Sequence, residues 1–478
     1  MNPSIETSKP PAAHQVWTLV LASFGVFMTS LDTLVVSSSL PALRSSLHAG
    51  LGDLEWTVNA YNLSFACLLL TGAALGDRYG RRRMYWIGLL AFTLASALAA
   101  LSPTIGALIA ARALQGAAAA IVTPMTLTLI SAAFPADKRG TAIGIWGGVT
   151  GLAVAAGPVV GGAIVGGLSW QWIFWLNVPI GLLLVPLAAT RLTESHGPRT
   201  QLDIIGLILA AAGFFGITWA LVRVADIGWG ATETVLTLTA GLLLVAAFLG
   251  WERRSRTPML SRELFRSRTF VTTNAYSFFM WASLFGVLFL IMQFLQTALG
   301  YSPLAAGLRT LPWTAAPLVI APLAGALADR YGNKPFMLLG LTLEAAGLGW
   351  LAAIAEPGMS YAQLGPALAV AGIGISFCFP TVANAVIGSV PPAEMGIASG
   401  TNSAIREIGG VFGIAVLATV FNHPGVYDSP RVFIDHFSRS VWLGAAFAVL
   451  GVLAAALLRE RPAGTEAVRL PVERALPV

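Results

Sequence analysis

Six charged side chains fall within long apolar stretches of the sequence, and these residues are the ones best placed to do chemistry. They are Asp32, Arg112, Arg309, Glu344, Arg406 and Glu407. A charge at the centre of a lipid bilayer costs on the order of 2.5 to 3.5 kcal/mol on insertion scales, and charges in such positions commonly serve a function. Arg309 lies near the end of its stretch, where its long side chain reaches water. The carboxylates among the others are candidates for binding and releasing a proton.

Asp32 and Arg112 are the first candidates for a proton-coupling pair. With a rise of about 1.5 Å per residue, both fall at a similar depth in the outer half of two helices that run in opposite directions. A poorly solvated carboxyl beside an arginine changes between its protonated and ionised forms when its neighbours move slightly. We therefore expect Asp32 to take up a proton outside the cell and release it inside, with Arg112 tuning the exchange. The alternative is a permanent structural ion pair.

Glu344 and Glu407 are two further candidates for proton coupling, and both fall near the middle of their stretches. Glu407 fits either a proton or substrate site or a local ion pair. The adjacent Arg406 is expected to point elsewhere on the same helix. Glu344 is expected either to pair with Arg406 or to open toward lipid.

The stretches that hold these residues identify the chain as an all-α membrane protein. Of 478 residues, 56% are hydrophobic and 10% are charged, against roughly 25% charged residues in a soluble domain. Together with a mean hydropathy of +0.76, this excludes a soluble globular protein. A spanning helix needs about 20 mostly apolar residues. Fourteen such segments are predicted, and they begin near residues 16, 55, 84, 105, 140, 171, 203, 233, 270, 303, 335, 362, 396 and 439.

The positive charges predict the orientation of these segments. With the N-terminus in the cytosol, 21 of the 28 Lys and Arg residues lie on the inner side, as the positive-inside rule requires. The even number of segments returns the C-terminus to the cytosol. The basic residues cluster in short loops, where they set topology and do not indicate binding of nucleic acid. The Ala, Gly and Arg content indicates a bacterial source, and hence a multi-pass protein of the bacterial inner (cell) membrane.

The chain contains an internal repeat. The sequence AALGDRYGRR recurs 252 residues later as GALADRYGNK, and TPMTLTLISAAFPADKRG aligns with FPTVANAVIGSVPPAEMG at an offset of 256 residues. Each copy therefore holds six segments, with two more inserted between the copies. The predicted domains are a cytoplasmic tail 1–15, a six-helix half 16–190, two inserted helices with linkers 191–268, a second six-helix half 269–459 and a cytoplasmic tail 460–478. Parallel halves of this kind indicate a transporter whose substrate site lies between them near the bilayer midplane.

Several motifs resemble those of the major facilitator superfamily, and in particular its fourteen-helix drug:proton antiporters. The second DRYG copy matches the superfamily's loop motif in full, whereas the first has Ala73 where the family usually has glycine. Antiporter motifs of the first, fourth and fifth helices resemble LDTLVVSSSLPAL at 31–43, RALQGAAAAIVTP at 112–124 and GGVTGLAVAAGPVVGG at 147–162. The resemblance covers nearly the whole chain. It implies the major facilitator fold, with fourteen transmembrane helices, and antiport of drugs against protons.

The two DRYG loops are predicted to form a conformational latch. Its residues are Asp77, Arg78, Gly80 and Arg81 in the first copy and Asp329, Arg330 and Gly332 in the second. A carboxylate against the positive N-terminal end of a helix is worth roughly 0.3 to 2 kcal/mol. In this fold Asp77 would meet the segment that begins near 396, and Asp329 the segment that begins near 140, so each contact would join the two halves. The alternative is a tight glycine turn whose charges only set topology.

The fifth segment is predicted to act as a hinge. Its closely spaced small residues favour close helix packing, and its proline removes a backbone hydrogen bond and permits a bend. The residues assigned to this role are Gly151, Gly157, Pro158, Gly161 and Gly162. Plain helix packing without gating is the alternative.

Five residues are predicted to line a substrate cavity. They are Trp56, Tyr61, Trp146, Gln293 and Phe294. Aromatic walls offer stacking and cation–π contacts to flat or cationic compounds. The alternative for each aromatic residue is an interface anchor or a core position.

These observations together predict a monomeric transporter that exports a small, hydrophobic or cationic, drug-like compound in exchange for protons. Moving one charge across about 100 mV yields about 2.3 kcal/mol, so the proton is the coupling ion and no other cofactor is expected. Proton-coupled uptake of a small metabolite is the alternative. An enzyme is not expected, because the five histidines lie in tails, loops or helix ends without a catalytic motif around them. Cys67 and Cys378 lie in apolar stretches, so no disulfide or metal site is expected either.

Overall fold

The computed structural model describes residues 12–47, 51–197, 203–255, 267–391, 394–421 and 429–458, and these residues form helices joined by short connections. The first half contains α1 (Ala12–Leu47), α2 (Leu51–Tyr79), α3 (Arg81–Ala100), α4 (Ile105–Ala133), α5 (Ala136–Gly167), α6 (Trp172–Trp175) and α7 (Asn177–Arg191). The inserted pair is α8 (Ile204–Ile227) and α9 (Thr232–Glu252). The second half contains α11 (Arg268–Gln293), the π-helix η1 (Phe294–Ala298), α12 (Pro303–Arg309), α13 (Leu311–Thr314), α14 (Ala316–Tyr331), α15 (Lys334–Ile354), α16 (Tyr361–Gly388), α17 (Met395–Phe421) and α18 (Pro430–Ala456).

The prediction of an all-helical membrane protein is confirmed. Within the described residues, 13 helical stretches are long and apolar enough to cross a membrane, and the 32-residue α5 corresponds to the remaining predicted segment. The last segment was predicted to begin near residue 439, but α18 begins at Pro430. Its start is set by the Ser429 hydroxyl, which accepts a hydrogen bond from the Val432 amide at 3.3 Å, and polar first turns of this kind escape a search for apolar runs. The predicted tail 460–478 and most of 1–15 lie outside the described residues.

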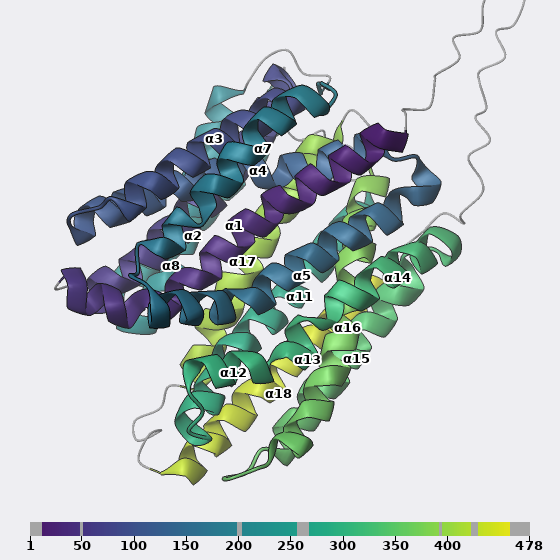
Figure 1. Ribbon diagram of the computed structural model, residues 1–478. Coiled ribbons are helices and arrows are strands. Elements are labelled where there is room, and N and C mark those ends of the chain that lie inside the picture. Colours follow the sequence, from purple (N-terminus) through teal and green to yellow (C-terminus); the bar gives the residue numbers. More distant parts are fainter. Residues whose placement is uncertain are drawn as a thin grey trace, which may run out of the picture.

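The two halves form separate bundles that lie side by side. Figure 1 shows α1 to α7 in purple to blue and α11 to α18 in green to yellow, with α5 and α14 where the two colours meet. We call the end of the bundle that carries the turns at Gly80 and Gly332 the inner end, and the opposite end the outer end. Both glycines have a positive φ, of 104° and 86°, which a residue with a Cβ adopts only with strain.

Small residues bring the halves together at the inner end. A Cβ placed on Gly144 of α5 would lie 2.5 Å from the carbonyl oxygen of Ala321 in α14. One placed on Gly400 of α17 would lie 2.5 Å from the Cβ of Ala73 in α2. Helix backbones approach this closely only where side chains are small. The structure is therefore closed at the inner end.

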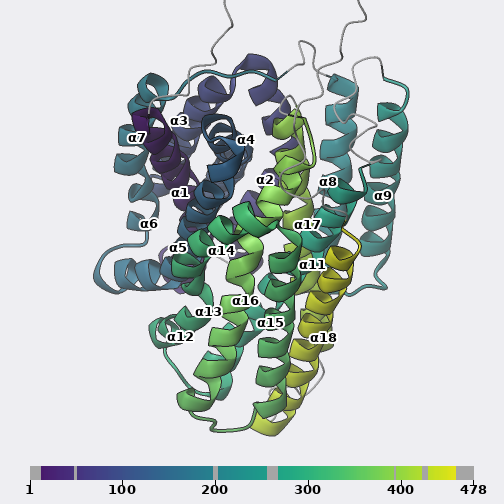
Figure 2. The same ribbon diagram turned by 90° about the vertical axis from the view of Figure 1, so that its right-hand side faces the viewer.

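The inserted pair packs against one side of this assembly. Figure 2 shows α8 and α9 standing together, with α8 between α9 and the rest of the bundle. The facing sides of α8 and α17 share an apolar cluster that includes Leu221 and Ala415. Beyond the end of α8, the Trp229 indole donates a hydrogen bond to the Thr419 hydroxyl of α17 at 2.9 Å. On its other flank α8 contacts α2 through Trp219 and Trp56, whose ring centroids are 5.0 Å apart. The inserted pair thus touches both halves.

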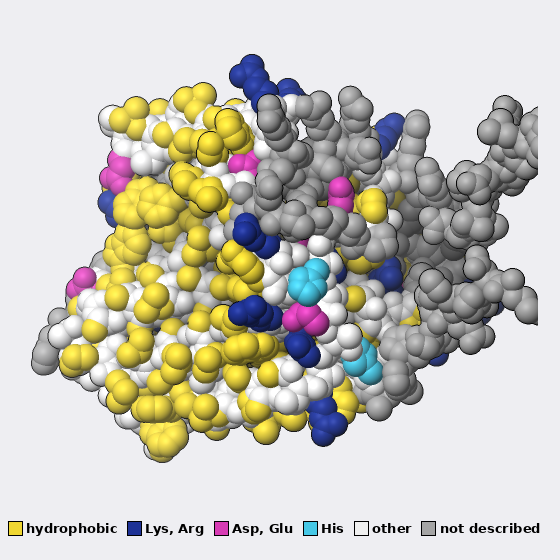
Figure 3. Space-filling view, turned by 90° about the horizontal axis from the view of Figure 1, so that it is seen from above, with side chains coloured by type: hydrophobic (Ala, Val, Ile, Leu, Met, Phe, Trp, Pro, Cys, Tyr) yellow, Lys and Arg dark blue, Asp and Glu magenta, His cyan; other side chains and the backbone are white. Residues whose placement is uncertain are grey.

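The sides of the bundle, between its inner and outer ends, are largely apolar. Leu183 of α7 and Leu243 of α9 are exposed over 63% and 65% of their surface. In Figure 3 hydrophobic side chains are spread over much of the described part of one face, whereas most of the charged side chains gather in a smaller part of it. An exposed apolar surface of this extent is expected of helices that face lipid.

Candidate functional site

A buried ion pair joins α1 and α4 in the first half. An Nη1 donor of Arg112 bonds to Oδ2 of Asp32, and the two side chains are 0% and 1% exposed. Arg112 also donates to the carbonyl oxygen of Thr57 at 3.0 Å and to Oε1 of Gln115 at 2.9 Å. The pairing expected from helix depth is therefore present. A buried charge pair of this kind is tolerated only when further hydrogen bonds satisfy it.

Neutral polar side chains complete the surroundings of Asp32. Its Oδ1 accepts hydrogen bonds from Asn177 at 2.7 Å and from Gln115 at 3.3 Å. The Ser96 hydroxyl oxygen accepts from the same two amides, at 3.2 and 2.6 Å. Ser96, Gln115 and Asn177 are not among the predicted site residues, because they carry no charge. Gln115 could have been found, since it lies one helical turn after Arg112 and shares its face.

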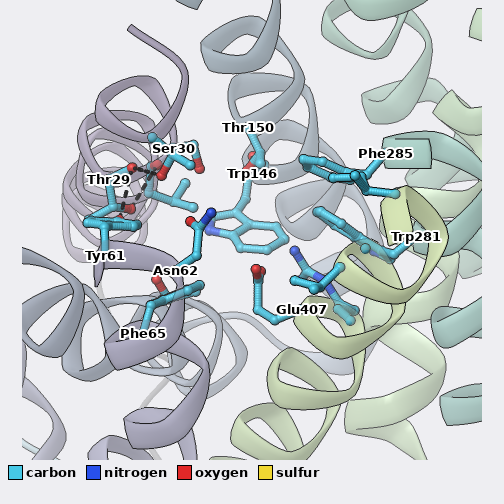
Figure 4. Close-up of a pocket in the computed structure, with 17 residues that line it drawn as sticks. Thr29, Ser30, Tyr61, Asn62, Phe65, Trp146, Thr150, Trp281, Phe285 and Glu407 are labelled. Carbon is cyan, nitrogen blue, oxygen red and sulfur yellow. Dashed lines mark hydrogen bonds between the residues drawn. The ribbon is translucent and has the colours of Figure 1, made fainter. Parts of the chain in front are cut away.

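A cavity of about 130 Å³ lies between the two halves. Its lining comes from α1, α2, α4 and α5 on one side and from α11 and α17 on the other. Figure 4 shows Glu407 pointing into this cavity, with Trp146 and Trp281 beside it and Tyr61 and Asn62 across from it. The cavity therefore combines one carboxylate with an aromatic wall.

Tyr61 separates the cavity from the buried ion pair. The guanidinium carbon of Arg112 lies 4.4 Å from the centre of the Tyr61 ring, and Tyr61 itself lines the cavity. Its hydroxyl donates a hydrogen bond to the carbonyl oxygen of Thr29 at 3.3 Å. The Asp32–Arg112 pair thus lies one side chain behind the cavity wall.

Arg406 lines the same cavity as Glu407, which corrects the expectation that it points elsewhere on α17. Its guanidinium carbon lies 4.0 Å from the centre of the Trp281 ring. Adjacent helical residues are separated by roughly 100° around the axis, but the long arginine side chain folds over the indole and reaches the cavity. A cation–π contact of this kind stabilises the desolvated guanidinium.

The predicted cavity residues fall into two groups. Tyr61 and Trp146 line the cavity, and the Trp146 indole donates a hydrogen bond to the Thr126 hydroxyl at 3.1 Å. The other three predicted residues lie elsewhere. Trp56 packs on the inserted helix α8, Gln293 ends α11, and the buried Phe294 stacks on Phe437 with ring centroids 4.4 Å apart.

Glu344 lies in the core of the second half and away from the cavity. Its side chain is 0% exposed, and among the described residues neither carboxyl oxygen has a hydrogen-bond partner. Both expectations for Glu344 are therefore wrong, because it neither pairs with Arg406 nor opens toward lipid. Its backbone nitrogen lies only 2.5 Å from where a Cβ on Gly374 would stand, so the close approach of α15 and α16 encloses it.

The second DRYG loop contacts the first turns of α5. Asp329 accepts hydrogen bonds from the amides of Gly140, at 2.9 Å, and Thr141, at 3.0 Å. The Thr141 hydroxyl donates to the same carboxylate at 3.2 Å. The expected contact of Asp329 with the segment that begins near residue 140 is therefore present.

The first DRYG loop lies against the start of α17, at the position that corresponds to the contact of the second loop with α5. Asp77 accepts hydrogen bonds from Nε and Nη2 of Arg81 at 2.9 and 2.8 Å, and a Cβ on Gly396 would collide with its carboxylate. The two arginines that follow the aspartates also repeat. Arg78 lies over the ring of Tyr79 at 5.0 Å, and Arg330 over the ring of Tyr331 at 5.3 Å. The duplicated sequences thus form duplicated structures across the boundary between the halves.

The chain that follows α7 covers the first loop, a feature that the sequence analysis missed. The Glu194 carboxylate accepts hydrogen bonds from the amides of Arg82 and Arg83 at 2.9 and 3.1 Å, and the Arg81 amide donates to the carbonyl oxygen of Ser195 at 2.8 Å. In the second half the Lys334 ammonium donates to the carbonyl oxygens of Ala456 and Leu458 at 2.9 and 2.8 Å. Each half therefore ties the start of its third helix to the end of its sixth.

The predicted hinge residues all lie in α5. Gly151 packs against Pro317 of α14, whose Cβ would lie 2.8 Å from a Cβ on the glycine. Gly157, Pro158, Gly161 and Gly162 lie nearer the outer end, and the helix continues through them to Gly167. Their role in bending stays a prediction.

Comparisons with known proteins show the family of the chain. The family model described as Major Facilitator Superfamily matches residues 22–414 and 273–476. The chain is 36% identical to the multidrug resistance protein Stp of Mycobacterium tuberculosis over 408 residues, which cover 85% of this chain and 76% of that protein. It is 33% identical to the tetracenomycin C resistance and export protein of Streptomyces glaucescens, with coverage of 84% and 75%. It is 34% identical to the cephamycin export protein CmcT of Amycolatopsis lactamdurans, with coverage of 96% of each.

Solved structures share the fold. The structure of the proton:xylose symporter XylE bound to 6-bromo-6-deoxy-D-glucose has a TM-score of 0.67 and covers 92% of this chain and 94% of that chain. The human organic anion transporter MFSD10 has a TM-score of 0.63, with coverage of 94% and 100%. Both are 16% identical to this chain, a level that shows the fold alone. By the family model and its curated relatives, this chain belongs to the major facilitator superfamily.

Proposed function

We propose that this protein exports hydrophobic or cationic, antibiotic-like compounds from a bacterial cell in exchange for protons. The relatives at 33 to 36% identity are named as multidrug resistance, antibiotic resistance and export proteins. The observation that carries the proposal is the position of the Asp32–Arg112 pair, one side chain behind a cavity between two halves. A proton site beside a substrate site is what coupled exchange needs.

In the proposed cycle, Asp32 holds the coupling proton and Arg112 controls its release. When Asp32 is ionised, Arg112 is bound to it and stays away from the cavity. Protonation of Asp32 removes the charge that holds Arg112, so the guanidinium is left to the Thr57 carbonyl, the Gln115 amide oxygen and the Tyr61 ring. Because Tyr61 lines the cavity, a shift of Arg112 against the Tyr61 ring alters the wall that the substrate contacts.

Glu407 supplies the cavity with its own carboxylate. It attracts a cationic compound when ionised and releases it when protonated, while Trp146, Trp281 and Phe285 offer faces for stacking. We propose that the proton and the cationic substrate compete for Glu407. Neutral hydrophobic compounds depend on the aromatic wall alone.

The closed inner end corresponds, in this proposal, to the outward-facing state. Opening toward the cytosol breaks the contacts of Asp329 with Gly140 and Thr141 and separates Asp77 from the start of α17. We propose that both termini lie in the cytosol, in line with the positive-inside rule, and that the protein works as a monomer in the bacterial inner membrane. One proton moved across about 100 mV supplies about 2.3 kcal/mol, enough for roughly a fifty-fold solute gradient.

The proposal is tested with purified protein in liposomes, with ethidium as the cationic probe and an imposed pH gradient as the energy source. The unmodified protein is expected to move ethidium against the direction of proton flow. The variant Asp32→Asn should lose gradient-driven transport. Asp53→Asn is the matched control, because Asp53 is an exposed aspartate in the first turn of α2, and it should transport normally. Unchanged coupling in Asp32→Asn, or ethidium that moves together with protons, would overturn the proposal.

A further inference from the structure

A second large void lies on the opposite side of α2 from the central cavity, between this helix and the inserted pair. We call this void the lateral groove. Its wall includes Cys67 of α2, Ala212, Phe215 and Trp219 of α8, and Ala240 and Leu244 of α9. This wall is almost wholly apolar. The helix α2 therefore presents Tyr61, Asn62 and Phe65 to the central cavity and Cys67 to the lateral groove.

The depth of the lateral groove places it within the hydrocarbon layer. Trp219 lies eight residues before the outer end of α8 at Ile227, which is about 12 Å along the helix axis. Ala212 lies a further seven residues toward the inner end, about 10 Å deeper. Such a wall offers water too few polar partners to stay bound, and it suits an apolar occupant.

The rim of the lateral groove is polar at the outer end. The Trp219 indole donates a hydrogen bond to Oε1 of Glu233 at 3.0 Å, and the Arg223 guanidinium approaches the same oxygen at 3.4 Å. Arg223 and Glu233 remain 30% and 43% exposed. An apolar slot below a charged rim has the polarity pattern of a phospholipid, whose headgroup carries charge and whose chains do not.

The groove is also continuous with the surface that faces the bilayer. Phe215, which lines the groove, is 46% exposed, and its neighbours Ile208 on α8 and Leu236 and Leu243 on α9 are exposed over 62 to 65% of their surface. Within the described residues, the groove is therefore open toward the lipid-facing side. We propose that the lateral groove binds an acyl chain of an outer-leaflet phospholipid, with the headgroup at Arg223 and Glu233, and that this chain supports the wall of the central cavity from behind.

The native cysteines offer a direct measurement on an unaltered groove. The sequence has two cysteines, and Cys378 is buried in the second half, so Cys378→Ala leaves Cys67 as a single reporter. The full-length protein is placed either in phosphatidylethanolamine–phosphatidylglycerol nanodiscs or in a short-chain detergent. We expect N-ethylmaleimide to alkylate Cys67 more slowly in the nanodiscs, and equal rates would overturn the proposal.

A photoreactive lipid locates the bound chain. Nanodiscs contain a phosphatidylglycerol with a diazirine in the middle of one acyl chain, and crosslinked peptides are identified by mass spectrometry. Crosslinks should concentrate on the stretches around 67, 211–219 and 237–244. Ala212→Phe, which fills the groove, should abolish them, whereas Ala91→Phe, on the exposed face of α3, should leave them intact.

Two results would overturn the assignment of a lipid. Crosslinks that are no more frequent in the groove than around Ala91 would mean that the groove is ordinary lipid-facing surface. Loss of the groove crosslinks on addition of ethidium would make the groove a substrate site instead. Because neither readout depends on transport, the test remains decisive if the proposed proton coupling fails.

Discussion

The ring of Tyr61 covers the guanidinium of Arg112, with 4.4 Å between the guanidinium carbon and the ring centre. On one side of the Tyr61 side chain lies the buried Asp32–Arg112 ion pair, and on the other lies the cavity between the halves. A single aromatic side chain therefore stands between the site proposed for the proton and the site proposed for the substrate.

The first prediction concerns this barrier. Tyr61→Phe keeps the ring and loses one hydrogen bond to the Thr29 carbonyl oxygen, worth about 1 kcal/mol, so coupled transport should survive. Tyr61→Ala removes the ring and opens the Asp32–Arg112 pair to the cavity, so protons should leak without substrate. A pH-sensitive dye inside proteoliposomes measures the leak. Equal leak rates in the two variants would show that the ring is no barrier.

The second prediction concerns the charge of Glu407. Glu407→Gln should weaken binding of ethidium by tenfold or more, because a hydrogen bond or contact to a charged group is worth about 1.5 to 3 kcal/mol. Binding of an uncharged hydrophobic dye should change little, since the aromatic wall is intact. Fluorescence titration of both dyes measures the difference. If the affinity for both dyes fell equally, Glu407 would contribute to the shape of the cavity and not through its charge.

The third prediction concerns the inner-end latch. Asp329→Asn replaces the carboxylate that accepts hydrogen bonds from Gly140 and Thr141. This change should destabilise the state with a closed inner end, relative to the inward-open state, by about 0.3 to 2 kcal/mol. The inward-open population should rise by up to about thirtyfold. The rate of maleimide labelling at Asn62→Cys, added from the inner side to protein without the native cysteines, reports this population.

Glu356→Gln is the control for the latch, because Glu356 is an exposed carboxylate in the connection between α15 and α16 at the outer end. Its labelling rate should match that of the parent protein. If the cysteine in the Asp329→Asn variant is also labelled at the parent rate, the charges of the DRYG loops set the membrane topology and do not stabilise the closed inner end.

The fourth prediction concerns Glu344. Glu344→Gln keeps the size of a side chain whose oxygens have no hydrogen-bond partner among the described residues, and it removes a group that does not line the central cavity. Proton-to-ethidium coupling should therefore equal that of the unmodified protein, and thermal stability should not fall. Lost coupling in this variant would return Glu344 to the proton pathway that the sequence suggested.

Much of the architecture follows from the sequence because its signals are local or repeated. Apolar runs of spanning length predicted the helices, and the resemblance to the major facilitator superfamily implied which DRYG loop meets which helix across the two halves. Asp32 and Arg112 were found because a charge in an apolar run is conspicuous. The depth argument then sufficed to pair them, since both lie on helices whose direction the topology fixes.

The composition of the cavity was harder to predict, because it depends on how each helix is rotated about its axis. A helix that is apolar on all sides has no polar face in its sequence that would show this rotation. Phe294 was therefore assigned to the cavity, although it packs on Phe437. Arg406 was missed because its reach depends on Trp281, which lies on another helix. The neutral residues Ser96 and Asn177 gave no signal that separates them from other polar residues in the chain, whereas Gln115 is marked by its position one turn after Arg112.

The joint between the third and sixth helices takes its charged side chain from the sixth-helix side in the first half and from the third-helix side in the second. In one copy the Glu194 carboxylate accepts from amides at the start of α3, and in the other the Lys334 ammonium donates to carbonyls at the end of α18. In both copies the start of the third helix donates and the chain at the end of the sixth accepts, so the direction of the hydrogen bonds is the same and only the side that carries the charged group differs. Loss of Glu194 would therefore leave backbone amides without this partner, whereas loss of Lys334 would leave backbone carbonyls without it.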